Sequence, residues 1–105
     1  MRARDRRALA SHLENLLVHL LKWCYQPAEH SGSWRSTIRT QRRELRRLLS
    51  QNPSLRPLVP SVMADGYGDA CLEASDETGL SLVTLPDVCP WTAEQVLASG
   101  FWPEA

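Results

Sequence analysis

The sequence predicts an all-α fold, a small helical bundle of three main helices followed by a short C-terminal helix. Two long stretches repeat apolar residues at spacings of three and four, which is the period of an amphipathic helix. Proline and glycine fall between the helical stretches, where they end helices and form turns. A chain of 105 residues is long enough to form one hydrophobic core without disulfides or a structural metal, so we expect a single helical domain over residues 1–105.

The first predicted helix covers residues 5–26, and Pro27 stops it. Its apolar residues recur at helical spacing: Leu9, Leu13, Leu16, Leu17, Leu20, Leu21 and Cys24. Val18 and Tyr25 fall on the far side of the same helix. Because a helix that is apolar on more than one side must be covered on more than one side, we expect other parts of the chain or a second molecule there.

The second predicted helix covers residues 34–50, with Ser33 as its expected N-cap. Its apolar residues occupy one side: Trp34, Ile38, Leu45, Leu48 and Leu49. On the other side, an arc of about 60° holds a stripe of arginines, Arg35, Arg39, Arg42 and Arg46. A guanidinium presents paired planar donors that suit carboxylate and phosphate. These four arginines are therefore the candidate contacts to an acidic partner or a phosphate.

The third predicted helical region covers residues 53–78. Asn52 and Pro53 favour a helix start, a bend follows, and Ser61 is the expected cap of the longer part, which Gly79 ends. Residues 80–90 lack a helical period and should cross the bundle in extended form or as a single turn. Thr92 and Gln95 have the form of a capping box that opens a short helix over residues 93–99.

Charge is divided between two parts of a chain whose net charge is zero. All 12 Lys and Arg residues precede Pro57, which leaves +8 in that part and −8 in the rest. Such a division favours an acidic partner or nucleic acid, or else neutralisation of one part by the other within the fold. We expect several of the four stripe arginines to lie near carboxylates of the acidic part.

No residue pattern predicts catalysis, a metal or a cofactor. Cys24, Cys71 and Cys89 are widely spaced without a C-x-x-C pair, which fits neither a zinc site nor a disulfide framework. His12 and His19 lie two helical turns apart, about 10 Å along the axis, too far to share one metal. A row of carboxylates is interpreted as an exposed face: Asp65, Asp69, Glu73 and Glu77.

The cellular location is predicted from two features. The longest apolar run, Leu16 to Leu21, is far shorter than the roughly 20 residues that cross a bilayer, so we expect no membrane association. An odd number of cysteines without a disulfide framework is typical of a reducing compartment. We therefore expect a cytoplasmic protein.

Three stretches together resemble a known family: LLVHLLKWCYQP (16–27), SWRSTIRTQRRE (33–44), and ETGL (77–80) with CPWT (89–92). In order and spacing they are similar to the bacterial family catalogued as domain of unknown function twenty-nine. The resemblance implies a helical fold and a bacterial origin, and it carries over no catalytic residue. Members of that family usually have an additional acidic N-terminal portion, so we expect the first helix here to lack part of its usual cover.

Three functions remain open from the sequence. The favoured one is a non-enzymatic module that binds an acidic protein partner. The first alternative is a nucleic-acid-associated regulatory protein that uses the arginine-rich second helix, and the second is an enzyme whose site is assembled from scattered Cys, His and Asp residues. A homodimer through the first helix is also expected, because its apolar surface is wider than one neighbouring helix covers.

Overall fold

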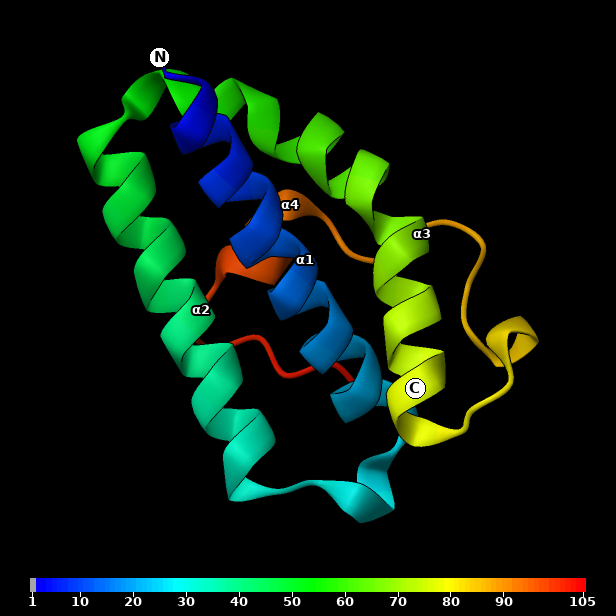
Figure 1. Ribbon diagram of the computed structural model, residues 1–105. Coiled ribbons are helices and arrows are strands. Elements are labelled where there is room, and N and C mark those ends of the chain that lie inside the picture. Colours follow the sequence, from blue (N-terminus) through cyan, green and yellow to red (C-terminus); the bar gives the residue numbers. More distant parts are fainter. Residues whose placement is uncertain (1) are drawn as a thin grey trace.

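A central helix, α1 (Ala3–Tyr25), lies between α2 (Gly32–Gln51) and α3 (Val59–Thr78) in a computed structural model (Figure 1). The structure describes residues 2–105, so Met1 of the predicted 1–105 domain lies outside the described part. Short 3₁₀ turns, η1 (Pro27–Glu29), η2 (Pro53–Leu58) and η3 (Leu82–Thr84), connect the helices. The last helix is α4 (Ala93–Leu97). Residues 2–105 contain no strand, which confirms the predicted all-α bundle.

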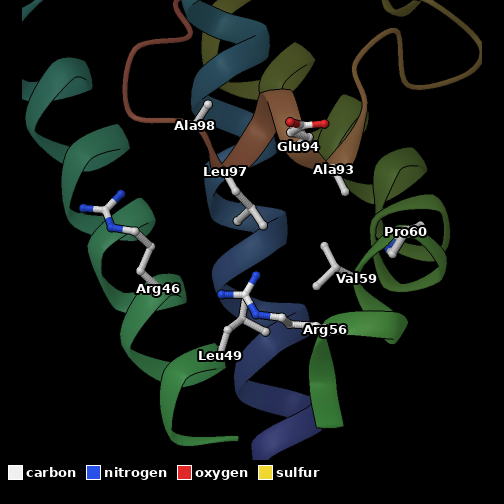
Figure 2. Close-up of a pocket in the computed structure, with 9 residues that line it drawn as sticks. All are labelled: Arg46, Leu49, Arg56, Val59, Pro60, Ala93, Glu94, Leu97 and Ala98. Carbon is white, nitrogen blue, oxygen red and sulfur yellow. The ribbon is translucent and has the colours of Figure 1, made fainter. Parts of the chain in front are cut away.

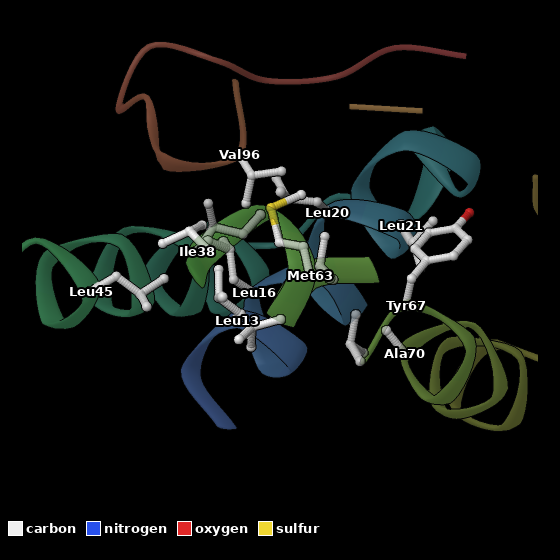
Figure 3. Packing of buried hydrophobic residues seen from close by; sticks show 14 of the residues in the cluster. Leu13, Leu16, Leu20, Leu21, Ile38, Leu45, Met63, Tyr67, Ala70 and Val96 are labelled. Carbon is white, nitrogen blue, oxygen red and sulfur yellow. The ribbon is translucent and has the colours of Figure 1, made fainter. Parts of the chain in front are cut away.

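The apolar surface of α1 is covered within the chain. Its leucines from Leu9 to Leu21 are buried, and so is Val18, whose exposed fraction is 0%. Helices α2 and α3 pack against α1, and Figure 3 shows Val96 of α4 above the cluster that holds Leu20 and Met63. Val18, which lies on the far side of α1 from the leucine line, is thus covered by other parts of the chain, one of the two covers expected for it. The breadth of this apolar surface is explained by burial in one chain, so it no longer supports a dimer through the first helix.

Two helices begin at different residues from those predicted. Ser31, and not Ser33, caps α2, since its hydroxyl accepts a hydrogen bond from the Trp34 amide at 3.1 Å. Helix α3 begins at Val59 rather than after Ser61, whose hydroxyl donates to the Leu58 carbonyl at 3.0 Å. Pro60 is compatible with this earlier start because amides in the first turn of a helix need no partner within the helix.

Two other predicted helix ends are confirmed. Gly79 ends α3 in the left-handed region, with φ +79°, a conformation that glycine adopts without steric cost. Thr92 and Gln95 form the capping box of α4, since the Thr92 hydroxyl accepts from the Gln95 amide and the Gln95 side chain accepts from the Thr92 amide. Helix α4 ends at Leu97, two residues earlier than predicted, because Ala98 is extended and a turn follows it, in which the Phe101 amide donates to the Ala98 carbonyl at 3.1 Å.

One ion pair joins two helices in the described part of the chain. The buried Lys22 amine of α1 donates to the Glu77 carboxylate of α3 at 2.7 Å and lies 5.0 Å from the centre of the Trp34 ring. The other ion pair among residues 2–105, Arg47 with Glu44, lies within α2. Helices α2 and α3 lie on opposite sides of α1 (Figure 1), so the arginines of α2 cannot meet the carboxylates of α3.

Candidate functional site

The four stripe arginines occupy different environments. Arg35, Arg39 and Arg46 are exposed, whereas Arg42 is buried with an exposed fraction of 1%. None of the four forms an ion pair with a carboxylate of residues 2–105. The expected nearness to the acidic part does not amount to an ion pair at any of the four, although Arg46 lines the same groove as Glu94. The physical reason is the position of α1, which separates α2 from α3.

Arg42 attaches the C-terminal segment to α2. Its Nε donates to the Val96 carbonyl at 2.9 Å and its Nη2 to the Phe101 carbonyl at 2.8 Å. The guanidinium carbon also lies 5.5 Å from the centre of the Trp102 ring. Burial, together with the Arg46 charge, lowers the pKa of Arg42 to about 10, so the side chain stays protonated at neutral pH. Arg42 is thus a structural cation and is not available to a partner.

Arg35 and Arg39 lie over aromatic rings. The Arg35 guanidinium carbon is 5.6 Å from the centre of the Trp23 ring, and that of Arg39 is 5.7 Å from the centre of the Trp102 ring. The two tryptophan rings are 4.8 Å apart, so they connect the C-terminal segment to α1. A contact between a guanidinium and an aromatic ring contributes about 0.5–1 kcal/mol at exposed sites. Stacking on tryptophan thus takes the place of the expected carboxylate contacts.

Arg46 lines a groove of about 470 Å³ that α2, α3, η2 and α4 enclose. Figure 2 shows Arg46 on α2, Arg56 reaching from η2 toward Leu49, and Glu94 at the α4 end. The remaining lining is apolar: Leu49, Val59, Pro60, Ala93, Leu97 and Ala98. Among residues 2–105, Arg46 and Arg56 have no ion-pair partner. The groove therefore combines an apolar lining with two exposed guanidiniums and the carboxylate of Glu94.

A second cavity continues the groove along α3. Its volume is about 480 Å³, and it shares Pro60, Ala93 and Glu94 with the first cavity. Its other lining residues are Met63, Ala64, Val88, Cys89, Trp91 and Thr92. The two cavities are neighbours on the surface, since they share three lining residues. The arginines lie at one end of this groove and the ring of Trp91 lies at the other.

Sequence reasoning identified Arg46 but missed Arg56. Arg56 lies between Leu55 and Pro57, in a stretch that the sequence marks only as a bend. Arg56 reaches the groove because η2 places this residue beside the end of α2. No local sequence pattern indicates that placement. A weak signal existed, since Arg56 is the last basic residue before the acidic part of the chain.

Two histidines lie within hydrogen-bonding distance of oxygens of the chain, and two cysteines have thiols that burial keeps protonated. His12 Nδ1 lies 2.6 Å from the Gln41 side-chain oxygen, and His19 Nδ1 lies 2.9 Å from the Asn15 carbonyl. Burial raises the pKa of the Cys71 and Cys89 thiols, which disfavours the reactive thiolate. Within residues 2–105, no group of three or more His, Cys, Asp or Glu side chains is placed to hold a metal ion. No helix of the described residues is both long and apolar enough to span a bilayer.

The comparisons with known proteins agree with the resemblance noted in the sequence. A family model described as "Domain of unknown function DUF29" matches residues 1–102. No curated protein and no solved structure matches the chain. The match covers nearly the whole chain, including every helix described above, and its description names no activity.

Proposed function

The chain belongs to the family described as Domain of unknown function DUF29, and from the geometry of its groove we propose that it is an interaction module for an acidic segment of a protein partner. The observation that carries the proposal is the pair of exposed arginines, Arg46 and Arg56, in a groove whose other lining residues are apolar except for Glu94. Neither guanidinium is neutralised by a carboxylate of the described chain.

The groove favours a ligand with both carboxylate and apolar groups. An ion pair at an exposed arginine contributes only about 0–1 kcal/mol, so charge alone would give weak binding. Burying apolar surface adds about 25 cal/mol per Å², which the accessible parts of Pro60, Leu97 and Ala98 can provide, whereas Leu49 and Val59 are already buried. Carboxylates placed on the two guanidiniums would then select the ligand and its orientation.

A binding role is favoured over catalysis because the first cavity lacks the side chains that catalysis uses. Besides the two arginines, the only titratable group that lines this cavity is the Glu94 carboxylate. No Ser, Cys, His or Lys lines the cavity. A carboxylate without a nucleophile or a second acid–base group does not form a catalytic set. The second cavity adds Cys89, but burial raises the pKa of its thiol.

Nucleic acid is the second candidate, on one specific observation. Five arginines of α2 are exposed: Arg35, Arg39, Arg43, Arg46 and Arg47. Such a row could contact successive phosphates, and binding would then weaken steeply with salt. Two of these guanidiniums already lie over tryptophan rings and Arg47 pairs with Glu44, which leaves fewer of them free for phosphate.

Binding of a labelled peptide in which Asp and Glu alternate with Leu and Val tests the proposal, with fluorescence anisotropy as the readout. The double variant Arg46→Glu/Arg56→Glu should weaken binding about tenfold or more, because two attractive contacts become repulsive. The matched control is Arg43→Glu/Arg47→Glu, which makes the same charge change on exposed residues that do not line the groove.

Three outcomes of this experiment are decisive. Equal losses in both double variants would mean that net charge, and not the groove, governs binding. A peptide that fails to bind the wild-type protein would overturn the proposal. If a duplex DNA or RNA probe binds instead, and the control variant lowers its affinity as much as the groove variant does, the function belongs to the arginine face of α2.

A further inference from the structure

The protein itself carries a segment with the chemistry that the groove selects. Residues 82–88 form a loop beside α3 that contains η3 (Figure 1). Leu82 is exposed, and the exposed fractions of Val83 and Val88 are 91% and 77%. Asp87 is exposed in the same loop, and Asp76 and Glu77 precede it at the end of α3. Apolar side chains of this size are seldom left in water together without a partner.

The base of this loop is fixed. Leu85 is buried, and the Tyr67 hydroxyl of α3 donates a hydrogen bond to the Pro86 carbonyl at 2.7 Å. Leu82 and Leu85 line a small cavity with Tyr67 and Cys71 of α3. Tyr67 is eight positions beyond Val59, about 12 Å along the helix axis from the groove. Val83 is therefore held away from the groove of its own chain, whereas Val88 at the other end of the loop lines the second cavity of that chain.

We propose that the groove of one copy binds the 82–88 loop of a second copy. Val83 would enter the apolar part of the groove, and Asp87 would meet Arg46 and Arg56. Charge complementarity favours this occupant, since Asp87 is the one charged residue of the loop and the groove carries two guanidiniums against the single carboxylate of Glu94. The inference rests on the proposed function, because it identifies the acidic segment as one of this chain.

The contact joins two different surfaces, so it is heterologous. Two copies can exchange loops and close a dimer, or successive copies can continue in a chain, depending on the rotation between them. In either case each molecule contributes one groove and one loop. Association should weaken as salt is added, because the paired charges lie near the surface and are screened.

Light scattering over a dilution series tests the inference. The wild-type mass should rise above the 11.9 kDa of one chain with concentration and fall as sodium chloride is added. Val83→Glu should return the mass to that of the monomer, and its fold should be unchanged because the side chain is exposed. Arg46→Glu/Arg56→Glu should also be monomeric, whereas Arg43→Glu/Arg47→Glu should still associate.

Mixing the two monomeric variants gives the sharpest result. The Val83→Glu chain keeps an intact groove and the Arg46→Glu/Arg56→Glu chain keeps an intact loop, so an equimolar mixture can form one groove–loop contact and its average mass should rise above that of either variant alone. A wild-type protein that stays monomeric throughout the series, or a Val83→Glu variant that still associates, would overturn the inference. Binding of the acidic peptide to Val83→Glu reports separately on the groove, so failure of self-association is distinguished from failure of the proposed function.

Discussion

Arg42 occupies a position that a helical wheel assigns ambiguously. It follows Ile38 by four residues and precedes Leu45 by three, which is the spacing of the buried face, yet it also continues the line of exposed arginines. Arg42 is buried because the carbonyls of Val96 and Phe101 accept its hydrogen bonds. These two residues lie 54 and 59 positions further along the chain. A sequence pattern within one helix holds no information about those acceptors.

Replacing Arg42 with Met should destabilise the fold. Two hydrogen bonds from a charged donor would be lost, and the buried Val96 carbonyl would lose its side-chain partner; losses of this kind cost about 2–4 kcal/mol in total. Arg43→Met is the control, since this exposed neighbour should change the free energy of unfolding by less than about 0.5 kcal/mol. Urea denaturation measures both, and equal values would contradict the structural role of Arg42.

At the scale of the elements, the helices could be predicted more accurately than their first residues. The apolar period of α1 and the stop at Pro27 defined that helix to within two residues of its observed ends. Ser31 and Ser33 are both chemically able to cap α2, and only the backbone path through η1 selects Ser31. The groove could not be predicted, because it is formed where α2, η2, α3 and α4 meet and no single element contains it.

The central position of α1 predicts the effect of a single core substitution. Leu20 has no exposed surface, so Leu20→Ala should lower the free energy of unfolding by about 2–5 kcal/mol through lost burial and a residual cavity. Leu72→Ala on α3 is the matched control, because the same atoms are removed from a side chain that is half exposed. Chemical denaturation should give a clearly smaller loss for Leu72, and similar losses would show that α1 is not the packed centre.

At the scale of the whole molecule, the charge division becomes a separation in space. Arginines cluster on α2, carboxylates cluster on α3, and α1 lies between the two helices (Figure 1). Among residues 2–105, only Lys22 and Glu77 form an ion pair between helices. Each outer face therefore carries mainly charges of one sign. The net charge of zero does not reveal this arrangement. From the sequence alone, the basic and acidic parts could equally have neutralised one another by pairing within the fold.

This separation predicts that sodium chloride stabilises the monomer. Like charges repel within each face, and salt screens repulsion over distances of about 10 Å at 0.1 M, so the melting temperature should rise with moderate salt. The measurement uses the Val83→Glu variant, in which self-association should not contribute. Adding Arg43→Glu to it should raise the melting temperature at low salt and flatten the salt dependence, because the new carboxylate lies four residues from both Arg39 and Arg47. A melting temperature that falls steadily as salt is added would show that attraction between the two faces outweighs the repulsion within them.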